Sequence, residues 1–196
     1  MNTSKTTLIN FGEFGHNFKG HLLFEVSKSS YVFGRVALET AQPFGNYNVG
    51  LHLIHHAIET GIKAFFENLD IQWEFGNNGH NFTYLLNHAK ESGKKELQFL
   101  VDKIMNTSLM PLLRELENNY MSNKYSEVGF GISNGELMID KFDEIMFILV
   151  EEFYKLNDSG LEQLRQVELY PGSEKLFTRK LKQPFRIVIW PDISLI

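Results

Sequence analysis

The chain contains no cysteine, which excludes disulfides, thiolate metal ligands and cysteine nucleophiles. No apolar run approaches the ~20 residues that a membrane-spanning helix needs. The polar start of the chain also lacks the apolar core of a signal peptide. Basic residues are too few for non-specific nucleic-acid binding, since the formal net charge is −5. These absences predict a soluble, cytoplasmic protein that does not bind a membrane.

The residues that are present predict a folded protein. A length of 196 residues suits one domain, or one domain with an appendage, and 17 phenylalanines contribute to a hydrophobic fraction of 43%. We divide the chain into a polar N-terminal lead-in at 1–19, a helical region at 20–158 and a C-terminal extension at 159–196.

Helical periodicity dominates the middle region. Apolar residues recur at spacings of three and four in five segments, at about residues 20–42, 49–69, 80–92, 94–120 and 136–156. Pro111 should kink or split the fourth segment, because proline lacks an N–H and clashes with the preceding turn. The predicted fold class is therefore all-α.

The C-terminal extension differs in character. We expect one short helix at about 161–168, followed by a turn at Tyr170-Pro171-Gly172. The β-branched run at 185–190 predicts either a β-strand or an extended packing arm. A strand there would need a partner, which would be either another segment of the extension or a second subunit.

Four polar residues of the second predicted helix fall near one face, because His52, His55, His56 and Glu59 are spaced i, i+3, i+4 and i+7. One interpretation is a metal site. A zincin motif is excluded, because no acid lies between the histidines. The other interpretations are a structural role at the polar margin of a half-buried helix, and a pocket in which neutral imidazoles bind a small molecule. Glu59 and Lys63 are four apart, the spacing of a helical ion pair.

Three short segments, at 55–64, 79–86 and 119–125, resemble motifs of the HEPN domain family (higher eukaryotes and prokaryotes nucleotide-binding). The pattern Glu59-x-x-x-Lys63 resembles the family's Ala-x-Glu-x-x-x-Lys-Ala helix. Gly79-His80-Asn81-Phe82 with the following Leu-Leu pair resembles its His-Asp-Leu-x-x-Leu segment. Residues 119–125, which include Lys124, resemble its Tyr-x-x-x-Arg-Tyr tract. The resemblance implies an up-and-down bundle of four or five helices that dimerises through helix faces.

The resemblance also implies an activity that can be checked in the sequence. Many members resemble metal-independent ribonucleases that use an arginine followed four to six residues later by a histidine. In such a pair the imidazole takes a proton from a ribose hydroxyl and the guanidinium stabilises the phosphate charge. None of the five arginines has a histidine at that spacing, and no histidine follows His88. We therefore predict that the usual ribonuclease mechanism is absent.

The remaining expectation is a non-catalytic module that binds a nucleotide, another small anionic ligand or a protein partner, as a homodimer and without a cofactor. The candidate ligand-binding residues, which should converge between helices, are His55, His56, Glu59, Lys63, His80 and Lys124. A structural role, in which these side chains only tie helices together, is the competing interpretation.

Three alternative functions stay open. The first is a ribonuclease with a displaced site, in which His80 and Lys124 meet in space. The second is a metal-dependent enzyme built on the helix face that contains His52, His55, His56 and Glu59. The third is a scaffold whose basic, apolar tail at 175–196 is a docking arm.

Overall fold

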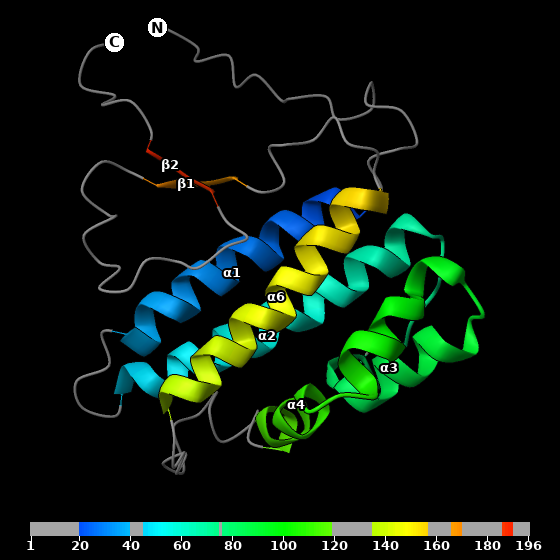
Figure 1. Ribbon diagram of the computed structural model, residues 1–196, viewed down its shortest axis with the longest axis horizontal. Coiled ribbons are helices and arrows are strands. Elements are labelled where there is room, and N and C mark those ends of the chain that lie inside the picture. The colour runs from blue at the N-terminus through cyan, green and yellow to red at the C-terminus, as the bar shows by residue number, and fades with distance from the viewer. Residues whose placement is uncertain are drawn as a thin grey trace, which may run out of the picture.

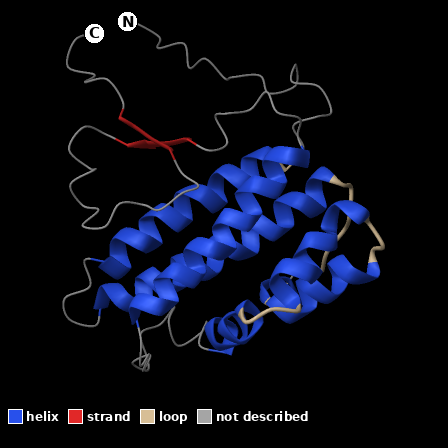
Figure 2. Cartoon of the chain, in the orientation of Figure 1, coloured by secondary structure: helices blue, strands red, loops and turns tan. Residues whose placement is uncertain are grey.

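The computed structural model describes residues 20–39, 45–74, 76–118, 135–156, 166–169 and 186–189. Helices dominate these ranges (Figures 1 and 2), as the sequence predicts. The α-helices are α1 (His21–Glu39), α2 (Gly45–Asn68), α3 (Phe82–Glu91), α4 (Leu109–Asn118) and α6 (Gly135–Leu156). Three short turns of other helix types join them: η3 (Asn77–His80), η4 (Lys95–Leu97) and the π-helical η5 (Leu100–Met105).

The hairpin of α1 and α2 is packed closely because small residues line its contact. Ser27 Oγ donates a hydrogen bond of 2.6 Å to the carbonyl of Ala57 on α2. A Cβ on Gly61 would lie 2.9 Å from that same hydroxyl, and a Cβ on Gly50 would lie 3.0 Å from the carbonyl of Gly34. The contact between Gly34 and Gly50 lies further along α1 than Ser27 does, but earlier along α2 than Ala57 does. The two helices therefore run antiparallel.

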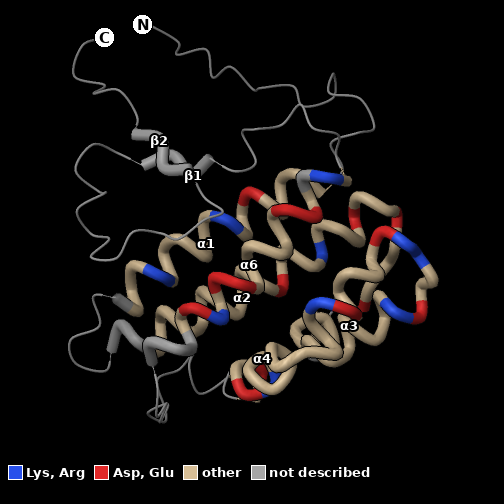
Figure 3. The backbone as a smooth tube through the Cα atoms, viewed as in Figure 1, with Lys and Arg blue, Asp and Glu red and all other residues tan. Residues whose placement is uncertain are grey.

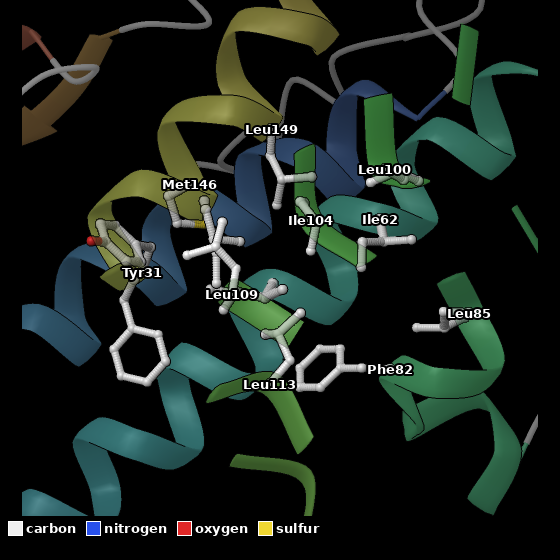
Figure 4. Close-up of a cluster of buried hydrophobic side chains, with 14 of the residues drawn as sticks. Tyr31, Ile62, Phe82, Leu85, Leu100, Ile104, Leu109, Leu113, Met146 and Leu149 are labelled. Atoms are coloured by element: carbon white, nitrogen blue, oxygen red, sulfur yellow. The ribbon is translucent and has the colours of Figure 1, made fainter. Parts of the chain in front are cut away.

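The core lies between this hairpin, α6 and the α3–α4 half of the bundle. Figure 4 shows buried side chains from all of these parts converging, including Tyr31, Ile62, Phe82, Leu113 and Leu149. Aromatic rings join α1 to α6, because the rings of Phe24 and Phe153 stack with their centroids 4.1 Å apart. The apolar periodicity of the sequence thus marks the faces that meet in the core.

A buried polar group also joins α1 to α6. Arg35 Nε donates to Asp143 Oδ1 at 2.8 Å, and a terminal guanidinium nitrogen donates to Oδ2 at 3.1 Å. The hydroxyl of Tyr31 donates to the same Oδ1. All three side chains are buried, so this two-pronged pair is shielded from solvent screening.

The segment predicted as one helix at 94–120 is divided, as the proline suggested, but the break is not at Pro111. It falls at 106–108, between η5 and α4. Pro111 lies in the first turn of α4, where its missing N–H would have no intrahelical partner anyway. The proline is therefore compatible with α4. The helical segment before α4 ends with the π-helical turn η5.

The C-terminal extension contributes two strands to the described residues. Of the two alternatives for 185–190, a strand or an extended arm, the structure has a strand, β2 (Arg186–Ile189), and its partner is β1 (Gln166–Leu169). The two pair in parallel, with Val167 opposite Ile187. The prediction of a helix at 161–168 is wrong at 166–168. The sequence Gln-Val-Glu-Leu alternates polar and apolar residues, the period of a strand, and pairing with β2 supplies the hydrogen bonds that a lone strand lacks.

Within the described ranges, no helix combines the length and apolarity needed to cross a membrane. Lysine and arginine are interspersed with aspartate and glutamate along these helices (Figure 3). The predicted lead-in at 1–19 and the tract at 119–125 lie outside the described residues.

Candidate functional site

Glu59 is the centre of the candidate site. It lies within α2, and only 3% of its side chain is exposed. Its Oε1 accepts a hydrogen bond of 2.6 Å from Lys63 Nζ, one turn further along the helix. Its Oε2 lies 2.9 Å from His80 Nδ1 and 3.6 Å from His55 Nδ1. Both oxygens of a buried carboxylate are thus engaged, as burial of a charge requires.

His80 reaches this carboxylate from a different element. It is the last residue of η3, and 46% of its side chain is exposed. The turn that precedes His80 requires a glycine at 79, because a Cβ there would lie 2.5 Å from the carbonyl of Glu74. The glycine-rich turn at 76–79 therefore brings the exposed histidine to the buried acid.

His55 lies on the inner side of the site. Burial, and to a smaller extent the neighbouring imidazoles of His52, His80 and His56, lower its pKa from 6.5 to about 3. The ring packs against Phe82 with centroids 4.5 Å apart. His55 is therefore a neutral imidazole at physiological pH. It adds a dipole to the cluster and no charge.

His56 belongs to the electrostatic surroundings of the site. Burial is the main cause that lowers its pKa, and the charges of Glu59 and Lys63 act on it in opposite directions. Four of the six predicted residues come together around one carboxylate: His55, Glu59, Lys63 and His80. Lys124 lies outside the described residues, so its predicted place beside His80 stays a prediction.

The N-terminus of α3 borders the site and is capped by a residue that the sequence analysis missed. Glu117 of α4 accepts from the backbone N–H of Phe82 at 2.8 Å and of Thr83 at 3.3 Å. It also accepts from the amide of Asn81, whose own Oδ1 caps Tyr84 N at 2.6 Å. Asn81 before an apolar run is a readable N-cap signal. Nothing local in the sequence indicates Glu117.

The metal interpretation finds no support in the geometry. Across the described parts of the chain, no group of three or more His, Asp or Glu side chains is arranged to hold one metal ion. The predicted ligands share a helix face, but His55 and Glu59 are turned toward His80 and Phe82 of the next elements.

No family model, curated protein or solved structure matches the chain.

The chemistry of the site follows from the contacts above. A lysine and a histidine, from two elements, are held side by side by one buried carboxylate. An ammonium group has three N–H donors, and Glu59 accepts one of them. The ammonium group of Lys63 and the imidazole of His80 are therefore two neighbouring hydrogen-bonding groups at the rim of the site.

Proposed function

We propose that this chain is a non-catalytic, HEPN-like helical module that binds a small phosphate-bearing ligand, such as a nucleotide, at the rim formed by Lys63 and His80. One observation carries the proposal: the buried Glu59 holds two donors from α2 and η3 at adjacent positions, one of them nearly half-exposed. Preorganised donors bind an anion at low entropic cost, because their side chains are already fixed.

The arrangement favours binding over cleavage. The sequence lacks an arginine with a histidine four to six residues later. In addition, Glu59 engages Nδ1 of His80 and so fixes the orientation of the ring. The site therefore fits recognition of a phosphate better than abstraction of a ribose proton.

Calorimetric titration of the purified full chain with inorganic phosphate, AMP and ADP tests this proposal. We expect the wild type to bind at least one of them, and Lys63→Met and His80→Ala to weaken binding about tenfold or more. His88→Ala is the matched control, because His88 contacts the carbonyl of Gln72 at 2.7 Å and is not bonded to Glu59. Absence of binding by the wild type, or equal binding by all variants, contradicts the proposal.

A ribonuclease assay separates the main alternative. The proposal predicts no cleavage of single-stranded RNA above the level of the His80→Ala variant. Cleavage that disappears in His80→Ala would show instead that the site is catalytic. Homodimerisation, which the resemblance implies, is a separate part of the proposal, and light scattering on the eluting protein measures it directly.

A further inference from the structure

The segment that contains His80 is tied to α3 by Tyr84. The hydroxyl of Tyr84 accepts a hydrogen bond of 3.2 Å from the backbone N–H of Glu74, upstream of the histidine. The backbone N–H of Tyr84 donates at 2.6 Å to Oδ1 of Asn81, the residue directly after the histidine. Tyr84 therefore holds the chain on both sides of His80.

The turn between these two anchors is closed by hydrogen bonds of its own. The carboxylate of Glu74 accepts from the side-chain amide of Asn78 at 2.6 Å. The carbonyl of Asn78 accepts from the backbone N–H of Asn81 at 3.0 Å. Together with the two bonds of Tyr84, these contacts form a closed cycle through Tyr84, Glu74, Asn78 and Asn81. Because the members of such a network support one another, His80 lies in a segment whose backbone cannot shift without breaking a bond.

We propose that Tyr84 is a positioning residue of the phosphate site, whose hydroxyl holds the turn where Nδ1 of His80 meets Glu59. The imidazole is 46% exposed, so the backbone of the turn must fix much of its position. Its contact with Glu59 is 2.9 Å long, and a displacement of about 0.5 Å is enough to weaken a preorganised contact of this kind. This inference rests on the proposed function, in which His80 contacts the ligand.

Nitrogen NMR of the histidine side chains in the full chain tests the positioning without any ligand. The Nδ1 signal of His80, identified by its loss in His80→Ala, depends on the hydrogen bond that this nitrogen makes. Tyr84→Phe removes only the hydroxyl and keeps the ring that packs against the core. We expect it to shift the Nδ1 signal. Ser92→Ala is the matched control, because the Ser92 hydroxyl accepts from the backbone N–H of Lys94 at 3.3 Å, at the other end of α3. An unchanged Nδ1 signal in Tyr84→Phe, or an equal shift in Ser92→Ala, overturns the proposal.

A second pair of variants tests the cycle at an exposed position, where a substitution leaves the core intact. Glu74→Ala removes the group that accepts from Asn78, whereas Glu74→Gln keeps an acceptor oxygen at the same place. We expect Glu74→Ala to shift the Nδ1 signal of His80, as Tyr84→Phe does, and Glu74→Gln to keep the wild-type signal. Equal behaviour of the two Glu74 variants overturns the proposal.

Titration with AMP and inorganic phosphate separates this inference from the proposed function. Tyr84→Phe should weaken binding about three- to tenfold, the effect of losing one hydrogen bond, and Ser92→Ala should not. If the wild type binds neither ligand, the proposed function is contradicted, and the Nδ1 signal alone decides the role of Tyr84. If His80→Ala weakens binding and Tyr84→Phe does not, the proposed function is supported and the positioning role of Tyr84 is overturned.

Discussion

Replacing Asp143 should destabilise the bundle more than any loss of a surface ion pair. The Asp143→Leu variant removes the carboxylate that accepts two N–H groups of Arg35, at 2.8 and 3.1 Å, inside the protein. Removing one partner of a buried ion pair costs about 3–5 kcal/mol, because the other charge remains in a low-dielectric environment. With a urea slope of about 2–3 kcal/mol per M, the midpoint of unfolding should fall by roughly 1–2.5 M.

Two further variants sharpen the measurement. The double variant Arg35→Met with Asp143→Leu should recover much of the lost stability, because replacing both partners with apolar groups removes the buried charge altogether. Lys103→Ala is the control, since Lys103 is half-exposed and bonds to Glu152 at 2.6 Å. An exposed pair contributes only about 0–1 kcal/mol. An Asp143→Leu loss no larger than that of Lys103→Ala would refute the assignment of Asp143 as the partner of a buried charge.

Three smaller perturbations have equally definite outcomes. Gly20→Ala and Gly93→Ala both place a side chain at positive φ (+77° and +65°), but only at Gly20 would the Cβ overlap a backbone carbonyl, at 2.1 Å. Thermal unfolding should show that Gly20→Ala is less stable than Gly93→Ala by about 1–3 kcal/mol. His55 is neutral when folded, so as the pH falls from 6.5 toward 3 the unfolded chain binds a proton that the folded chain excludes, and stability falls. Urea midpoints at pH 7 and pH 5 should therefore differ less in His55→Leu than in the wild type or in His88→Leu. Glu117→Gln should cost about 0.5–2 kcal/mol and accelerate amide exchange in the first turn of α3, since it removes the capping charge.

The helices were predictable because burial imposes a period on the sequence. The apolar positions of 49–69 and 136–156 recur every three to four residues, and α2 and α6 cover nearly the same ranges. The segment predicted as a helix at 161–168 was too short for this signal, and at 166–168 pairing with a distant strand decided the conformation. The break before α4 did have a local signal, because 106–108 is an Asn-Thr-Ser run of turn and N-cap residues and Thr107 accepts a hydrogen bond from the Leu109 N–H. A proline in the first turn of the following helix fits the same signal.

The candidate site, too, could be predicted only in part from the sequence. Helix geometry alone brings His55, Glu59 and Lys63 to one side of α2, because residues four apart are neighbours. His80 meets Glu59 only because the turn at 76–79 folds back on α2.

The sequence by itself determined the helices, their buried faces and the row of polar residues on α2, because these follow from contacts between near neighbours in the chain. Only the tertiary structure decided that Glu117 caps α3, 35 residues earlier, and that Arg35 pairs with Asp143, 108 residues later. The path of the loops and the packing of the helices fix such distant pairs. A helical pattern specifies which face is buried, but it leaves open which helix lies against that face.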